Sequence, residues 1–490
     1  MAVPRIFLRR TCARWGRVGR FNPRERLFSI SSRIRQEYIS RWDQEYNDSI
    51  EDPGWQGFSS RRLRLRLPSK KEPDDHDVHY VTVQLDDGKF SFDPAFLRDS
   101  CTCPRCVDPS SKQKFFETAQ IPSTIKANIK TITPTVLDGS GPAFEITWEN
   151  DVPGYPDDHT THISANFLHG SKRASRETRY IRGPYSPPRR FWDSELIAKE
   201  NLWVDYSAYM NDDDTLHLVL QHLHTHGLAF IRGVPDNERE LEDAIAPRIG
   251  PLKRSFYGDT WNVRSVPDAK NIAYTNKYLG LHMDLLYVTN PPHLQFLHSL
   301  RARASGGESM FSDSFFTARQ LLQSDRDRFD ALRSYPVLYR YHNDGQYYEN
   351  VRPVIETAQT LPFKRRIKTP DISPADITRV NWSPPFQGPN NHGAVKTIQD
   401  LSNKKKRLYR RYLDAAAEFS RLVNDPRNMF SYRMKEGECV IFDNRRVLHA
   451  RREFDVNSGE RWLKGCYIDD EVYYSRLETL RVAQLQKAGN

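Results

Sequence analysis

Short apolar segments separated by turn residues fill the C-terminal half of the chain, and they constrain its fold more than any other feature. Residues 228–235 are the clearest example, an apolar strand closed by Gly233 and Pro235. Helical patterns interrupt this series near 315–333 and 403–424. Many short strands with few helices favour a sandwich or barrel of the jelly-roll type. We therefore predict a mainly β fold with helices.

The positive charge of the chain is concentrated at its N-terminus. The 490 residues carry 73 Lys and Arg against 63 Asp and Glu, a formal net charge of +10. Ten arginines, no lysine and two glutamates lie within residues 1–40, so this stretch accounts for most of the surplus. Because the remainder is close to neutral, we do not predict a basic surface of the kind that binds nucleic acid.

Residues 1–35 have the composition of a mitochondrial presequence. They are rich in Arg, poor in acidic residues and contain Ser and spaced apolar side chains, as a basic amphipathic helix requires. Residues 26–32 also resemble the cleavage region of matrix-targeted precursors. A solvated basic tail is the alternative. We expect this segment to be removed and the mature protein to be soluble in the mitochondrial matrix, since no apolar run reaches the ~20 residues of a membrane-spanning helix.

Composition divides the rest of the chain into two domains and two linkers. Residues 36–77 are polar and rich in turn formers, which is typical of a partly disordered linker. Residues 78–170 show alternating strand patterns with a hairpin signal at residues 86–88, and we predict a small β domain there. A Pro- and Arg-rich linker at 171–195 precedes the jelly-roll domain, which we place at 196–485.

Three clustered cysteines predict a metal site in the small β domain. Cys101, Cys103 and Cys106 supply three thiolates, and a tetrahedral zinc site needs a fourth ligand. His159 and His162 are the candidates. Four protein ligands would close the coordination sphere, so the zinc would be structural. A nucleic-acid-binding finger is disfavoured because a second Cys or His pair at finger spacing is missing.

Two histidines and an aspartate predict a second metal site. His282 and Asp284 are two residues apart, and residues i and i+2 of a strand project from the same face. With a distant histidine, for which His449 is the candidate, they would form the two-histidine-one-carboxylate arrangement of non-haem Fe(II) oxygenases. A competing pair, His342 and Asp344, precedes a glycine and is expected in a hairpin turn instead.

Arg461 follows His449 by twelve residues and adds an anion-binding group. Its guanidinium is permanently charged and planar, so it binds a carboxylate through two hydrogen bonds. We expect Arg461 on a strand neighbouring that of His449, where it would hold the far carboxylate of an iron-chelating 2-oxo acid. The ordered combination of these four side chains is the main functional signal of the sequence.

These motifs resemble those of the γ-butyrobetaine dioxygenase family, relatives of the trimethyllysine dioxygenases within the taurine-dioxygenase-like group of Fe(II)- and 2-oxoglutarate-dependent oxygenases. The resemblance covers roughly residues 78–485 and follows the family order. It rests on segments 97–106, 256–261, 271–275, 282–284, 306–309 with Asp313, and 442–449.

The resemblance implies a double-stranded β-helix core with iron on His282, Asp284 and His449. 2-Oxoglutarate would chelate this iron. The matching cosubstrate positions are Arg461, for the distal carboxylate, with Asn271 and Leu297.

The family pattern also bears on the zinc site and the assembly. It favours His159 over His162 as the fourth zinc ligand. Family precedent suggests a homodimer, and ascorbate is expected to support activity.

A set of aromatic residues is implied to bind the substrate. In the family, the matching rings enclose a quaternary ammonium group, which has no hydrogen to donate and is held by cation–π attraction. Tyr257, Trp261 and Tyr274 stand at these positions, although three ordinary core aromatics are the alternative. The sequence departs from the γ-butyrobetaine enzymes at Leu285, where they carry a further Tyr, and Tyr287 is the candidate to replace it.

The implied activity is hydroxylation of γ-butyrobetaine by O2 to L-carnitine, coupled to oxidative decarboxylation of 2-oxoglutarate to succinate and carbon dioxide. Asn271, where trimethyllysine enzymes tend to have Asp, and the complete cysteine cluster favour this substrate. Leu285 and the extra segment at 364–370 leave trimethyllysine or another ammonium substrate open. A catalytically silent, zinc-stabilised interaction protein is the alternative from a different class, and the intact metal triad argues against it.

Overall fold

The computed structural model describes residues 80–85, 88–132, 143–172, 188–264, 275–357, 374–389 and 403–488. Several predictions concern residues outside these ranges. They are the presequence at 1–35, the linker at 36–77, Asn271, Tyr274 and the segment at 364–370.

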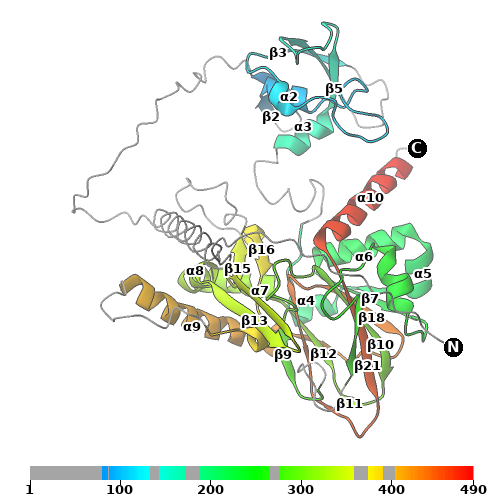
Figure 1. Ribbon diagram of the computed structural model, residues 1–490, viewed down its shortest axis with the longest axis vertical. Coiled ribbons are helices and arrows are strands. Elements are labelled where there is room, and N and C mark those ends of the chain that lie inside the picture. The colour runs from blue at the N-terminus through cyan, green and yellow to red at the C-terminus, as the bar shows by residue number, and fades with distance from the viewer. Residues whose placement is uncertain are drawn as a thin grey trace, which may run out of the picture. The chain divides into compact units, whose positions relative to one another are not determined.

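The N-terminal β unit, described at residues 80–85, 88–132 and 143–172, contains a hairpin, a sheet and short helices (Figure 1). β1 (Val81–Leu85) pairs antiparallel with β2 (Gly88–Phe92), which confirms the predicted hairpin. Gly88 adopts a φ of 137°, as this tight turn requires. The three described strands of the sheet are β3 (Lys126–Ile132), β4 (Ala143–Glu149) and β5 (Thr160–Ser164), and the helices are α2 (Pro94–Asp99) and α3 (Ala165–Lys172).

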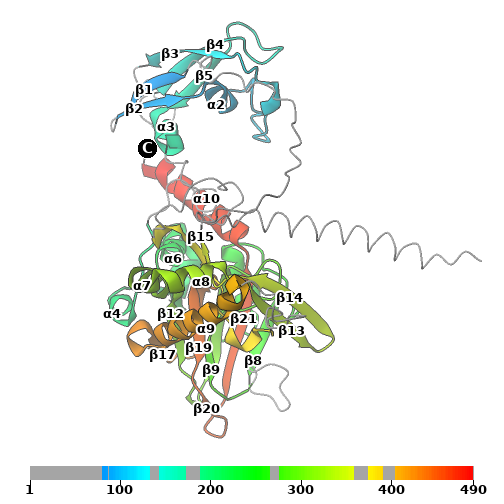
Figure 2. The same ribbon diagram turned by 90° about the vertical axis from the view of Figure 1, so that its left-hand side faces the viewer.

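Two sheets that share one inner core form the jelly roll (Figures 1 and 2). In the described chain the larger sheet has the order β6 (Trp203–Asp205), β7 (Leu228–Arg232), β18 (Glu438–Asp443), β10 (Leu294–Ala302), β21 (Arg461–Ile468), β8 (Thr260–Arg264). The smaller sheet has the order β17 (Phe430–Tyr432), β12 (Ser309–Asp313), β19 (Val447–Arg451), β9 (Leu279–His282). A short pair, β11 (Ser305–Gly306) with β20 (Phe454–Asp455), extends one end.

Alternation along the strands separates an inner from an outer core. On β10, Leu297 joins the inner cluster with Phe230 and Phe311, whereas Leu294 and Phe296 join the outer cluster. The outer cluster is completed by the helices α5 (Tyr206–Asn211), α6 (Asp213–Thr225) and α10 (Asp470–Ala488). Odd-numbered β10 side chains therefore face the interior between the sheets.

The helical stretch predicted at 315–333 is divided into two helices, α7 (Ser314–Ser324) and α8 (Arg326–Ser334). Asp325 causes the break, because its backbone is extended and its carboxylate accepts the Arg328 amide at 3.0 Å as the N-cap of α8. Helix α9 (Asn403–Val423) packs beside α8.

Two hairpins are described between α8 and α9. They are β13 (Val337–Asn343) with β14 (Gln346–Arg352), and β15 (Ile355–Thr357) with β16 (Ile377–Val380). Asp344 and Gly345 form the first turn with φ values of 51° and 70°. This confirms the turn predicted for the competing His342 and Asp344 pair.

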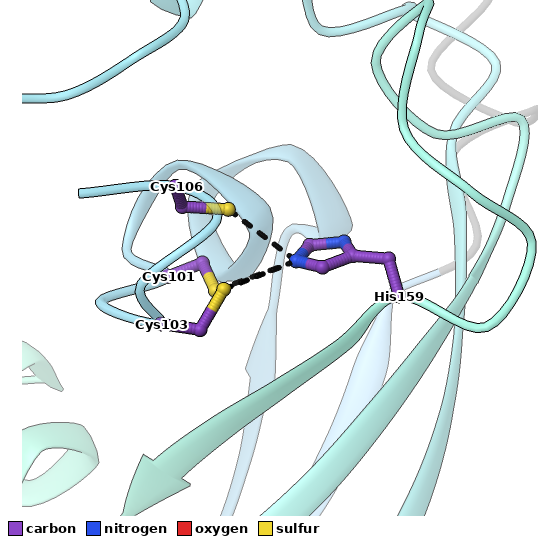
Figure 3. Close-up of side chains that lie close together, drawn as sticks. All are labelled: Cys101, Cys103, Cys106 and His159. Carbon is purple, nitrogen blue, oxygen red and sulfur yellow. Dashed lines mark hydrogen bonds between the residues drawn. The ribbon is translucent and has the colours of Figure 1, made fainter. Parts of the chain in front are cut away.

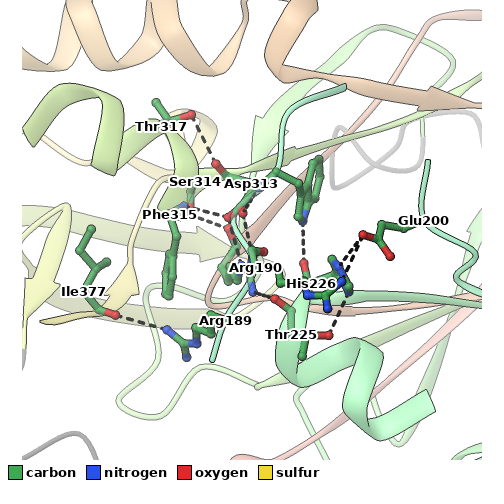
Figure 4. A network of polar contacts seen from close by, with 12 residues as sticks. Arg189, Arg190, Glu200, Thr225, His226, Asp313, Ser314, Phe315, Thr317 and Ile377 are labelled. Atoms are coloured by element: carbon green, nitrogen blue, oxygen red, sulfur yellow. Dashed lines mark hydrogen bonds and ion pairs between the residues drawn. The ribbon is translucent and has the colours of Figure 1, made fainter. Parts of the chain in front are cut away.

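A buried ion pair joins the start of α7 to the turn before β19. The Asp313 carboxylate accepts from Arg446 Nε at 3.1 Å and Nη2 at 2.8 Å, and both side chains are fully buried. Asp313 also caps α7 through the Phe315 amide (Figure 4). Arg446 Nη1 donates to the Thr225 carbonyl at 2.7 Å, which ties the end of α6 to the same cluster. This pair anchors the turn that precedes His449.

Candidate active site

Three side chains meet between the sheets with the geometry of a metal site. His282 ends β9 and pairs directly with His449 of β19, so both rings project to the inner side. His282 Nε2 lies 3.4 Å and His449 Nε2 4.0 Å from Asp284 Oδ1. The ligand atoms of the three residues all lie within 4.8 Å of one another.

Asp284 is positioned by a turn and not by the strand that carries His282, which corrects the prediction of a single strand face. β9 ends at His282, and Leu285 adopts a left-handed φ of 59°. The Asn444 side chain holds the turn: its Oδ1 accepts the Asp284 amide at 2.8 Å and its Nδ2 donates to the Asp284 carbonyl at 3.1 Å. The sequence indicated Asn444 only as a polar residue after a buried strand.

The protonation of the three groups suits a cation. Burial raises the pKa of Asp284, but hydrogen bonding to His282, the nearby His charges and the Tyr467 hydroxyl outweigh it, so the pKa lies well below its usual value. Burial, followed by the charge of His282, lowers the pKa of His449 to about 3. His282 Nδ1 lies 2.8 Å from the Gly280 carbonyl, so a neutral ring that donates Nδ1–H to this carbonyl offers its Nε2 lone pair to a metal. One carboxylate and two neutral imidazoles are the donor set that ferrous oxygenases use.

A cavity of about 70 Å³ extends from these residues into the interior. Its lining includes Leu297 and Arg461, both predicted to contact cosubstrate, and also Gln295 and Ser309. Arg461 begins β21 of the larger sheet, whereas His449 lies in the smaller sheet. The two residues are therefore on opposite sheets and not on neighbouring strands, and they meet because the sheets enclose one cavity.

Arg461 is a half-buried cation suited to an incoming anion. Burial, and then the charge of Arg451, lowers the pKa of Arg461 to about 9, and Glu308 partly compensates. Among the described residues Arg461 forms no ion pair; its Nε donates to the Gly307 carbonyl at 3.3 Å. Gly307 has a φ of 73°, and a Cβ there would lie 2.8 Å from Arg461 Nε, so this glycine makes room for the guanidinium.

Two stacked aromatic rings stand beside the metal site. Trp261 of β8 stacks on Tyr467 of β21 at 4.0 Å between centroids, and Tyr257 lies 6.5 Å from Trp261. The Tyr467 hydroxyl donates to Asp284 Oδ2 at 2.7 Å. Sequence reasoning missed Tyr467, although its spacing of six residues from Arg461 along one strand places both on the same face.

Tyr287, the residue expected to replace the missing tyrosine of the substrate-binding aromatics, does not lie with Trp261 at the metal cavity. It is 2% exposed and packs against Tyr341 and Phe386, each at 5.2 Å between centroids. It does not appear among the described residues that line the metal cavity. Leu285 is also buried.

The cysteine cluster of the N-terminal unit meets one of its two histidine candidates (Figure 3). His159 Nε2 lies 3.7, 3.6 and 3.3 Å from the sulfurs of Cys101, Cys103 and Cys106. His162 instead lies on β5 beside Glu145 and is 42% exposed.

Two further side chains support this cluster. Asp151 Oδ2 lies 2.7 Å from His159 Nδ1, and its other oxygen pairs with the buried Arg98. Arg98 also donates to Cys106 Sγ at 3.4 Å. Three thiols, an imidazole oriented by a carboxylate and mutual distances below 4.8 Å fit a tetrahedral zinc ion.

Comparison with known proteins agrees with the geometry. The family model described as taurine catabolism dioxygenase TauD, TfdA family matches residues 187–467, which include the metal triad and Arg461. The chain belongs to this family. It is a 2-oxoglutarate-dependent dioxygenase. Within the described part of this dioxygenase, no helix is long and apolar enough to cross a membrane.

Relatives extend the similarity beyond the matched segment. The dioxygenase is 35% identical to dioxygenase str8 of Strobilurus tenacellus over 89% of this chain and 94% of the relative. It is 31% identical to the γ-butyrobetaine dioxygenase of Pseudomonas sp. (strain AK-1) over 82% and 94%. It is 27% identical to the mitochondrial trimethyllysine dioxygenase of Mus musculus over 82% and 86%. The resemblance to the γ-butyrobetaine dioxygenase family is thereby confirmed.

Proposed function

We propose that this dioxygenase hydroxylates a trimethylammonium acid, and that γ-butyrobetaine, giving L-carnitine, is the substrate. The observation that carries the proposal is one cavity lined by the metal triad, by Arg461 and by Trp261, whose ring stacks on Tyr467. Each part suits one component of the reaction.

His282, Asp284 and His449 hold Fe(II) in the proposal. With 2-oxoglutarate and O2, the bound iron supplies oxidative decarboxylation to succinate and carbon dioxide, with one oxygen atom going to the substrate as hydroxyl. Asn444 fixes the backbone of Asp284, and Tyr467 fixes its Oδ2, so Oδ1 remains directed at the two histidines. The protein thereby provides a rigid carboxylate ligand before iron arrives.

Arg461 binds the distal carboxylate of 2-oxoglutarate in the proposal, with Leu297 against its methylene chain. The support is the lowered pKa of the Arg461 guanidinium, which an incoming carboxylate would raise again. Asn271 is proposed as a further cosubstrate contact.

The trimethylammonium group is proposed to lie against Trp261, Tyr257 and Tyr274. A quaternary ammonium offers no hydrogen-bond donor, so the faces of aromatic rings are its natural partners. Tyr467 joins this wall because its ring stacks on Trp261. Trimethyllysine or another ammonium acid is the second candidate, favoured by Leu285 at the position of an expected cage tyrosine and by the burial of Tyr287.

Zinc is proposed at Cys101, Cys103, Cys106 and His159, where four protein ligands leave no open position for catalysis. We further propose a homodimer in the mitochondrial matrix, with ascorbate supporting activity. The mitochondrial trimethyllysine relatives support the compartment.

A panel of ammonium acids tests the substrate. Purified protein with Fe(II), ascorbate and 2-oxoglutarate should release succinate faster with γ-butyrobetaine, and mass spectrometry should show the amine gaining one oxygen atom. Stimulation by trimethyllysine alone would transfer the assignment to that substrate. His282→Ala should abolish turnover. Failure of the parent protein to bind one iron per chain with 2-oxoglutarate would support the silent interaction protein instead.

A further inference from the structure

Gln295 is a buried polar side chain in the wall of the metal cavity. It lies on β10, is 2% exposed and lines the same cavity as His282, Asp284 and His449. Its amide oxygen has no hydrogen-bond partner among the described residues. Buried amide groups are almost always paired, so an unpaired one on a residue that lines a cavity is a candidate for contact with a ligand.

The strand register places Gln295 at the metal end of the cavity. Gln295 lies directly opposite Tyr467 of β21, whose hydroxyl contacts Asp284. Leu297, two residues further on the same face, lies opposite Gly465, and Arg461 begins β21 at the far end. Along one wall the order is therefore Gln295, Leu297 and then Arg461.

This order matches the chemical order of a 2-oxo diacid. Its metal-chelating end carries a carboxylate beside a keto group, its middle is two methylenes, and its far end is a second carboxylate. A 2-oxo acid offers only hydrogen-bond acceptors, so the atom of the Gln295 amide that pairs with it must belong to the NH2 group. A half-turn of the amide exchanges the positions of Oε1 and Nε2 without changing its shape, and it places the NH2 group where the unpaired oxygen lies.

We propose that Gln295 binds the 2-oxo-acid end of 2-oxoglutarate, with Nε2–H donating to the carboxylate beside the keto group. The inference rests on the assignment of this cavity to 2-oxoglutarate, but it does not depend on which amine is hydroxylated. The trimethylammonium group itself cannot pair with the amide because it has neither a donor nor an acceptor.

Anaerobic titration of the Fe(II)-loaded full chain with 2-oxoglutarate tests the proposal without amine or turnover. The charge-transfer absorption of the chelated iron reports binding. Gln295→Met removes the hydrogen bond to a charged group at similar volume, and we expect the Kd to rise about ten- to a hundredfold with the iron content unchanged. Gln295→Glu preserves the shape but repels the anion, so its Kd should rise further.

Ser312→Ala is the matched control. Ser312 is also buried, and its hydroxyl has no hydrogen-bond partner in the part of the chain that the structure describes. Alternation on β12 places it on the face opposite Phe311, and it is not among the described residues that line the cavity. Its Kd for 2-oxoglutarate should equal that of the parent protein.

An unchanged Kd in Gln295→Met, or a Gln295→Glu variant that binds no worse than Gln295→Met, would overturn the proposal. Loss of amine binding with intact 2-oxoglutarate binding would assign Gln295 to the substrate and overturn it as well. If no amine in the panel stimulates turnover but the Gln295 variants still show these Kd changes, only the proposed substrate is refuted.

Discussion

Gly465 lies beneath the Trp261 ring. Replacing Gly465 with alanine should displace the aromatic rings that we propose bind the amine, and it should leave iron binding unchanged. The two residues are direct partners across β21 and β8. A Cβ at 465 would lie 2.5 Å from Trp261 Cζ2 and 2.6 Å from Cε2, far inside contact distance. Since ordinary contact begins near 3.4 Å, the indole must move by about 0.9 Å.

This movement separates Trp261 from Tyr467, now stacked at 4.0 Å between centroids. Aromatic stacking contributes about 0.5–1.5 kcal/mol and a partly desolvated cation–π contact about 1–2 kcal/mol. Partial loss of both predicts about a tenfold rise in the amine KM, with the Kd for 2-oxoglutarate and the iron content unchanged.

Steady-state kinetics of Gly465→Ala, Trp261→Ala and the double variant provide the assay. If the indole transmits the effect, Gly465→Ala should add nothing once Trp261 is alanine. An undiminished effect of Gly465→Ala in the Trp261→Ala background would refute the reasoning. So would a loss of 2-oxoglutarate affinity in place of amine affinity.

Three further outcomes are expected. Asp313→Asn should lower the unfolding free energy by about 3–5 kcal/mol in urea titrations, because it leaves the buried charge of Arg446 without its carboxylate; an effect below 1 kcal/mol would contradict this. Asp151→Asn should weaken zinc binding about 10–100-fold in chelator competition, because His159 loses its orienting carboxylate; unchanged affinity would exclude that role. Burial lowers the pKa of His298 to about 4 from an ordinary 6.5. Between pH 6.5 and 4 the unfolded chain therefore binds one more proton at this histidine than the folded chain does. The unfolding free energy should fall by about 1.4 kcal/mol for each pH unit over this range because of His298. In urea titrations, His298→Asn should reduce this dependence on pH, and an unchanged dependence would contradict the prediction.

Much of the fold could be predicted because its signals are local. The hairpin at Gly88, the buried strand β7 and the turn at Asp344 and Gly345 each follow from a few adjacent residues. The helical pattern expected at 315–333 is present, and its division into α7 and α8 follows from the extended backbone and the capping carboxylate of Asp325.

The sequence by itself determined the chemical types of the ligands, since a His-x-Asp pair, a distal histidine, an arginine and a cysteine cluster are visible without a fold. Only the tertiary structure decided how they meet. It brought His159 and not His162 to the thiols, and it placed Arg461 on the sheet opposite His449.

The tertiary structure also revealed the supporting residues Asn444, Tyr467 and Gln295. Their roles depend on contacts between distant parts of the chain, and Asn444 contacts Asp284 across 160 residues. The alternation of side chains along the sequence predicts which residues share one face of a strand, but it does not predict which distant strand lies opposite. That pairing arises only when the two sheets close around a common interior.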